Sequence, residues 1–272
     1  MPANPVIARA ALHFWEEPVI SGEKGSGAVF FSGCNLHCVY CQNSNISGCS
    51  ANEGKSIPVS RLREIYFELI RQGACNINLV TPMHYTDAIL ESLQQPLPCP
   101  VVWNSNGYES VNSLRRCEGK INIYLPDLKY SSNEIALRYS HAGDYFETAA
   151  SAIDEMFRQT GPYRIGDDGL LKQGVVIRHL ILPGHADNSK RVIDYVASHF
   201  APGEVLFSLM RQYIPCGKVS KDQYSEINRK VSDEEYAEVE DHLFASGIED
   251  GFVQDKESAE NCFIPDFDET GV

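Results

Sequence analysis

Three cysteines in one short loop constrain this chain more than any other feature. Cys34, Cys38 and Cys41 follow an apolar run at 28–31 with the spacing C-x3-C-x2-C, and an aromatic residue, Tyr40, precedes the last of them. Three thiolates this close together can hold one inorganic cluster. A [4Fe–4S] cluster normally takes four cysteines, one for each iron. Three cysteines would leave one iron open, and an open position is typical of a catalytic metal site.

Two other interpretations of the loop need a fourth ligand. A zinc site normally pairs its ligands and adds a fourth Cys or His. His37 lies inside the loop, but Cys-x2-His-Cys is not a usual zinc spacing. A ferredoxin-type cluster could take Cys49 as its fourth ligand. The chain would then be a non-enzymatic electron-transfer or sensor protein.

The overall composition limits the classes of partner. The formal charge of −14 argues against a nucleic-acid groove, because phosphate binding needs clustered Lys and Arg. The nine cysteines are scattered apart from the triplet, which indicates a reducing compartment. The N-terminus lacks a signal-peptide pattern, and no apolar run approaches the ~20 residues of a membrane span. We therefore expect a cytoplasmic protein with no nucleic-acid or membrane partner.

Apolar segments that alternate with amphipathic ones indicate an α/β fold. Six strands are expected near residues 28, 77, 101, 121, 175 and 205. Helices are expected at 59–72, 86–94, 110–117, 149–159, 188–198 and 233–244, with Ser60 and Ser232 as caps and a loop at 161–174. Such alternation predicts parallel βαβ units, and six are too few for the closed eightfold barrel. The pattern predicts an open, partial barrel.

The 272 residues suit one large domain, and 43% apolar residues can form a sizeable core. We expect a single domain with its core at about 27–247. It is preceded by a lead-in at 1–26 and followed by an acidic tail at 248–272. The lead-in contains Trp15-Glu16-Glu17-Pro18 and a glycine-rich stretch at 21–27, which we expect to pack near the cysteine loop.

Polar side chains follow each predicted strand. In parallel α/β folds the functional residues lie at the carboxyl ends of the strands. Singly, each could cap a helix or form a local ion pair, but together they predict one site around the cysteine loop. The candidates are Thr81, Asn104, Ser105, Asn106, Asp127, Lys129 and Arg178, with His84, His179, His185, Gln212 and Tyr213 nearby.

The cysteine motif resembles the radical SAM superfamily, whose signature is C-x3-C-x-aromatic-C. The resemblance implies a partial (β/α)6 TIM-like barrel and a [4Fe–4S] cluster on Cys34, Cys38 and Cys41. It implies that the open iron binds S-adenosylmethionine (SAM), whose reductive cleavage gives a 5′-deoxyadenosyl radical that abstracts hydrogen from a substrate. It also implies an electron donor of the flavodoxin or ferredoxin type.

Within this resemblance, the candidate residues match the parts of SAM. Its carboxylate requires a cation or amide donors, which Arg178, Lys129 and the turn at 104–106 can supply. Its ribose and sulfonium suit short polar groups such as Ser105 and Thr81. Tyr40, beside the cluster, is the candidate for the adenine slot.

Short blocks from about 27 to 215 resemble the glycyl-radical-enzyme activases, such as pyruvate formate-lyase activating enzyme. The turn at 104–108 stands where activases carry Asp-Thr-Asn-Gly, and 126–129 where they carry Leu-Asp-Leu-Lys. Arg178 stands where they have an Arg in the fifth strand. The resemblance implies that these residues bind SAM, that an Asp pair holds a monovalent cation, and that a partner protein is the substrate. A radical SAM enzyme that modifies a small molecule or peptide is the alternative.

Two departures from the activases remove negative charge. Thr81 lies in Val-Thr-Pro, where activases carry a Gly-Gly-Glu turn that binds the amino group of SAM. Asn104 replaces the first Asp of the implied cation site. The amino group therefore needs another partner.

Overall fold

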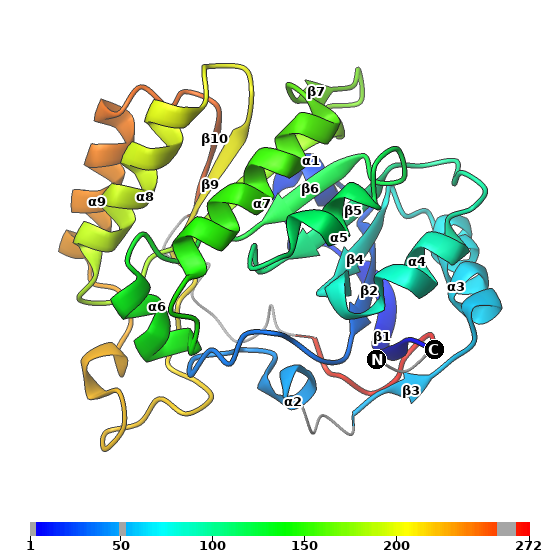
Figure 1. The fold of residues 1–272 in the computed structure, drawn as a ribbon, viewed down its shortest axis with the longest axis horizontal. Helices are drawn as coiled ribbons and strands as arrows, with labels where there is room; N and C mark the ends of the chain where they lie inside the picture. The colour runs from blue at the N-terminus through cyan, green and yellow to red at the C-terminus, as the bar shows by residue number, and fades with distance from the viewer. Residues whose placement is uncertain (1–3, 49–52, 255–264) are drawn as a thin grey trace.

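The computed structural model describes residues 4–48, 53–254 and 265–272. Its centre is one ten-stranded sheet with the order β10-β9-β8-β6-β5-β4-β2-β1-β3, and β7 pairs with β8 (Figure 1). The strands are β1 (Val6–His13), β2 (Ser26–Phe31), β3 (Lys55–Ser56), β4 (Ile77–Val80), β5 (Val101–Ser105), β6 (Ile123–Pro126), β7 (Arg164–Ile165), β8 (Leu171–Leu180), β9 (Leu206–Met210) and β10 (Gly251–Val253).

The six predicted strands are confirmed as a parallel series. β2, β4, β5, β6, β8 and β9 pair in the order in which they occur along the chain. This order progresses in one direction around the sheet, as in a barrel, and has no reversal point of the doubly wound kind. The fold is an α/β partial TIM-like barrel, as the sequence predicts.

The helices cover the outside of the sheet, with α3 and α4 near one edge and α8 and α9 near the other (Figure 1). On α3, Leu62, Ile65, Tyr66 and Leu69 are buried, so its apolar stripe faces the core. The helices are α1 (Pro18–Ser21), α2 (Ser44–Ser47), α3 (Val59–Arg71), α4 (Thr86–Ser92), α5 (Val111–Arg115), α6 (Asn133–Ser140), α7 (Tyr145–Thr160), α8 (Ala186–His199) and α9 (Asp233–Ala245), with 3₁₀ turns η1 (Pro82–Tyr85) and η2 (Ser225–Ile227).

Segments outside the predicted barrel core also join the sheet. The lead-in contributes β1, which pairs antiparallel with β2 and β3, and the tail contributes β10, which pairs parallel with β9. The expected loop at 161–174 contains β7 and the start of β8. α6 was not predicted. Local propensity misses the strands among these segments because pairing with neighbouring strands, rather than their own composition, stabilises them.

The expectation for the glycine-rich stretch is wrong. Gly25 accepts a backbone hydrogen bond from Cys75, and Gly27 donates one to Asn76, both just before β4. The stretch therefore lies at the amino ends of the strands, opposite the cysteine loop. The preceding residues, Trp15 and Glu16, instead line a cavity together with two of the cysteines.

The two predicted caps have different outcomes. Ser60 lies inside α3, and Pro58 is the residue that precedes the helix. Ser232 does cap α9, because its hydroxyl accepts from the Glu235 N–H at 3.2 Å. The Glu235 carboxylate accepts from the Ser232 N–H at 3.0 Å in return, which completes a capping box.

In the part of the chain that the structure describes, no helix has both the length and the apolar character needed to cross a bilayer.

Replacing Ser232 by Ala removes the cap of α9. We expect the free energy of unfolding to fall by about 1 kcal/mol, because one N–H of the first turn loses its acceptor. Urea denaturation measures the change. Ser198→Ala is the control, since that exposed hydroxyl donates only to Tyr195 O within its own helix. Equal losses in both variants would contradict the role of the capping box.

Candidate functional site

The predicted cysteine loop opens into a cavity of about 250 Å³ at the carboxyl ends of the strands. Cys38 and Cys41 form part of its wall. The other wall residues that the sequence predicts are Tyr40, Asn104, Asp127, Lys129, Arg178, Gln212 and Tyr213. The structure therefore brings most of the predicted site together around two of the three cysteines.

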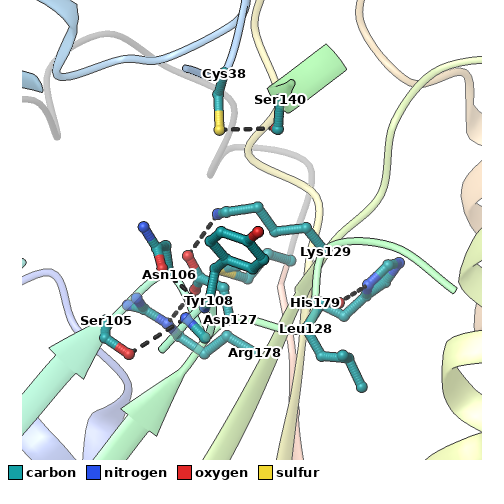
Figure 2. A network of polar contacts seen from close by, with 12 residues as sticks. Cys38, Ser105, Asn106, Tyr108, Asp127, Leu128, Lys129, Ser140, Arg178 and His179 are labelled. Carbon is teal, nitrogen blue, oxygen red and sulfur yellow. Dashed lines mark hydrogen bonds and ion pairs between the residues drawn. The ribbon is translucent and has the colours of Figure 1, made fainter. Parts of the chain in front are cut away.

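The third cysteine, Cys34, contacts the turn after β5. Its Sγ accepts a hydrogen bond from Asn106 Nδ2 at 3.3 Å, and Asn106 Nδ2 also lies 2.7 Å from Asn35 Oδ1. The Cys38 Sγ accepts from Ser140 Oγ at 2.9 Å (Figure 2). Donors directed at sulfur favour the thiolate form that binds metal.

The loop is also held through its backbone. The His37 and Val39 N–H groups donate to carbonyl oxygens at the end of α6, at 3.3 and 2.8 Å. Burial raises the pKa of the Cys34 thiol, and it raises that of Cys38 to about 12 although Lys129 and Ser140 oppose this rise. Both thiols are therefore protonated at neutral pH unless a metal displaces the proton.

Among the described residues, no three His, Cys, Asp or Glu side chains are arranged to hold a single metal ion. An iron–sulfur cube requires a different arrangement, because each cysteine binds a different iron. Cys34, Cys38 and Cys41 are all free, partly accessible thiols. Cys49, the alternative fourth ligand, lies outside the described residues.

Arg178 is the centre of the polar network on the cavity wall. Its Nε lies 2.9 Å from Asp127 Oδ1, and one terminal nitrogen lies 2.7 Å from Asn104 Oδ1. The other terminal nitrogen lies 3.1 Å from Glu16 Oε2. The guanidinium group thus joins β8, β5, the end of β6 and the lead-in (Figure 2 shows Arg178 beside Asp127).

Lys129 binds the other oxygen of the same carboxylate, with Nζ 2.6 Å from Asp127 Oδ2. Burial alone would raise the pKa of Asp127, but attraction to Arg178 and Lys129 outweighs it and holds the pKa below its usual range. Burial alone would lower the pKa of Lys129, but Asp127 keeps it raised. The pair is therefore ionised at neutral pH.

Glu16 is a site residue that the sequence did not identify. Its side chain is only 10% exposed, and Oε1 accepts from Asn78 Nδ2 and Asn104 Nδ2, each at 3.1 Å. The signal was the pair of adjacent carboxylates before Pro18, in a segment without apolar periodicity. Nothing in that segment shows which strand ends it would meet.

The Tyr40 side chain lines the cavity, and hydrogen bonds on its other side fix its position. Its hydroxyl lies 2.6 Å from that of Tyr130, which lies 2.7 Å from Ser140 Oγ. Ser140 in turn donates to Cys38, so a chain of hydrogen bonds runs from Tyr40 to Cys38. The Tyr40 ring packs edge-on against Tyr213.

Thr81 and Ser105 border the site without lining its cavity. Thr81 has φ 58°, a left-handed conformation that is unusual for a β-branched residue, and its N–H donates to Asn104 O at 2.8 Å. Ser105 is buried, and its hydroxyl accepts from Gly107 N–H at 3.2 Å. Both residues shape the turns that carry other site residues.

The candidate histidines lie away from the cavity wall. His179 is fully buried between Leu128 O and Ser189 Oγ, at 2.7 and 2.9 Å. His185 contacts the Tyr139 hydroxyl at 2.9 Å. His84 lies in η1, next to Gly33 at the start of the cysteine loop. The first two therefore support packing of the outer layer.

No family model matches the chain. An uncharacterised protein of Methanocaldococcus jannaschii is 31% identical over 234 residues, which cover 82% of this chain and 62% of that protein. The chain thus spans less than two thirds of the length of this relative.

Several solved structures share the fold at low sequence identity. SuiB of Streptococcus suis has a TM-score of 0.53 and 10% identity, covering 82% of this chain and 47% of SuiB. A mutant of spore photoproduct lyase has a TM-score of 0.53 and 14% identity, covering 82% and 74%. HydG, a maturase of the [FeFe]-hydrogenase, has a TM-score of 0.53 and 14% identity, covering 87% and 53%. These similarities establish the fold.

Replacing Asp127 by Asn leaves Arg178 and Lys129 with one anion fewer. We expect the free energy of unfolding to fall by about 3–5 kcal/mol at pH 7, because a buried charge loses its partner. The folded-state pKa of Asp127 is lowered, so its contribution is complete above the unfolded pKa of about 3.9 and is lost as pH falls further. Urea denaturation at several pH values measures this dependence.

Asp154→Asn is the matched control for this substitution. Asp154 pairs with His199 at 2.7 Å, and both side chains are about half exposed, at 49% and 43%. An exposed pair contributes about 1 kcal/mol or less. A loss at Asp127 no larger than that at Asp154 would contradict the buried network.

Proposed function

We propose that this protein is a radical SAM enzyme, with a [4Fe–4S] cluster on Cys34, Cys38 and Cys41. One observation carries the proposal: Cys38 and Cys41 open into the same cavity as the buried cation Lys129, at the carboxyl ends of a partial TIM-like barrel. SuiB, which shares the fold with a TM-score of 0.51 in this form, was crystallised bound to S-adenosylmethionine. The motif resemblance supports the same cofactor pair.

The residues present fit these groups. When bound, the reduced cluster and SAM supply a 5′-deoxyadenosyl radical that abstracts hydrogen. Asn106 and Ser140 donate to Cys34 and Cys38, which stabilises thiolate sulfur. Tyr40 offers an aromatic face beside the cluster loop for adenine, while its hydroxyl is satisfied by Tyr130.

Lys129 is the better partner for the SAM carboxylate. An ammonium group carries three N–H donors, and the bond to Asp127 uses one of them. Arg178 places one donor from each of its three nitrogens on Asp127, Asn104 and Glu16, so its guanidinium group is directed at protein acceptors and orients these side chains. Thr81 and Ser105 act through the turns that they form.

Two of the protein's own cations bind side-chain oxygens to which the resemblance assigns a monovalent cation. Arg178 binds Asp127 Oδ1 and Asn104 Oδ1, and Lys129 binds Asp127 Oδ2. These three oxygens are the side-chain acceptors that the resemblance assigns to the cation.

The first test is cleavage of SAM under anaerobic conditions. Protein reconstituted with iron and sulfide and reduced with dithionite should form 5′-deoxyadenosine from SAM. Cys38→Ala should lose both the cluster absorbance and the product. Cys99→Ala should keep both, because this cysteine lies before β5, at the opposite ends of the strands. No product from a protein with a filled cluster would overturn the proposal.

Replacing Cys49 by Ala distinguishes the enzyme from the electron-transfer or sensor alternative. A three-cysteine site keeps its cluster and still responds to SAM. Loss of the cluster would favour a four-cysteine carrier.

We further propose that the hydrogen comes from a protein or peptide backbone, as in an activase, with electrons from a flavodoxin or ferredoxin. The support is the sequence resemblance at 104–108, 126–129 and Arg178. The alternative, a small-molecule or peptide-modifying enzyme, shares the same site chemistry.

Electron paramagnetic resonance distinguishes these substrates. With SAM and a reductant, the protein should generate a stable glycyl radical on a partner protein encoded near it. Omitting SAM is the control. Turnover of a small molecule with no partner radical, across the candidate glycyl radical enzymes, would reject the activase role.

A further inference from the structure

Two strand ends in the proposed SAM site, those of β4 and β5, lack the carboxylate that activases carry there. Thr81 and Asn104 occupy these positions, and they are adjacent, because the Thr81 N–H donates to Asn104 O at 2.8 Å. A ligand with an ammonium group would therefore meet no acid from either strand end. The structure supplies an acid from a different part of the chain.

The carboxylate of Glu16, a residue of the lead-in, lies beside these two strand ends. Its Oε1 lies 3.1 Å from Asn104 Nδ2, and the residue lines the cavity that Cys38 and Cys41 also line. β1 anchors the segment before Glu16 by pairing with β2. Glu16 thus lies inside the barrel although it precedes the first barrel strand.

The surrounding contacts fix the orientation of this carboxylate. Asn78, Asn104 and Arg178 donate to it, one from each of β4, β5 and β8. A carboxylate accepts about four hydrogen bonds. These three contacts from the described residues therefore leave capacity for one more donor, and the cavity is the space from which a ligand reaches it.

The charges on the cavity wall indicate which ligand group fits. Asp127 already binds Arg178 and Lys129 through its two oxygens. Glu16 contacts one cation, Arg178, whereas Asp127 contacts two, so the charge of Glu16 is the less compensated of these two wall carboxylates. An ammonium group bonded to a carboxylate is among the stronger hydrogen-bonded pairs.

We infer that Glu16 binds the α-ammonium group of SAM and replaces the acid of the strand-end turn. The inference rests on the proposed function, since it assigns one contact within that site. Lys129 then holds the carboxylate of the same amino acid moiety, and the two opposite charges orient the methionine end towards the cysteine loop.

Glu17 provides a matched control. It is adjacent in sequence and only 8% exposed, and it lines a second cavity, which Glu16 and Arg178 also line, but not the cavity of the cysteine loop. Burial raises the pKa of its carboxyl, although attraction to Arg178 opposes the rise. Glu17→Gln makes the same chemical change one residue away.

The experiment is a double-mutant cycle between protein and ligand. Reconstituted wild type, Glu16→Gln and Glu17→Gln are titrated calorimetrically with S-adenosylhomocysteine and with its analogue that lacks only the α-amino group. In the wild type, S-adenosylhomocysteine should bind roughly 10- to 100-fold more tightly than the analogue, as for a hydrogen bond to a charged group. In Glu16→Gln this ratio should approach one, while Glu17→Gln should keep it.

The remaining outcomes separate the role of Glu16 from the proposed function. An unchanged ratio in Glu16→Gln, even with weaker binding of both ligands, would overturn the assignment, as would an equal loss in Glu17→Gln. Wild-type protein that binds neither ligand and forms no 5′-deoxyadenosine would overturn the proposed function as well. If Glu16→Gln does not fold, Glu16→Asp, which keeps the charge but shortens the side chain, should reduce the ratio in part.

Discussion

The site depends on the contacts of one buried cation, the guanidinium group of Arg178. It contacts Asp127, Asn104 and Glu16, and so joins three strands of the barrel to the N-terminal lead-in. A buried cation is tolerated only when anions and hydrogen bonds compensate for its lost hydration. Attraction to Asp127, Glu17 and Glu16 raises the pKa of Arg178 although burial alone would lower it, so the charge is permanent. The positions of the surrounding carboxylates follow from that charge.

A second set of contacts holds the cysteine loop. Asn106 and Ser140 reach the sulfurs of Cys34 and Cys38, and the end of α6 accepts hydrogen bonds from the loop backbone. Tyr145 links this set to the first, since its hydroxyl lies 2.9 Å from the carbonyl oxygen of Asn106 and 2.8 Å from that of Asp127. These contacts fix the orientation of the Cys34 and Cys38 side chains.

The barrel is predictable from sequence for a physical reason. Apolar runs that alternate with amphipathic helices leave few solutions other than parallel βαβ units, and each predicted strand is present in the sheet. The cavity residues Asn104, Asp127, Lys129 and Arg178 could be predicted because the carboxyl ends of parallel strands meet at one edge. β1 and β10 are not predicted because pairing with β2 and β9, rather than their own composition, stabilises them.

The sequence by itself determined the α/β class, the order of the strands and the cysteine loop, since local periodicity and spacing encode these features. Only the tertiary structure decided how the charges pair. Arg178 is turned towards protein acceptors, and Glu16 enters the cavity from a segment that carries no periodic signal. Such pairing depends on which distant side chains share a low-dielectric interior, and no local pattern in the chain specifies that.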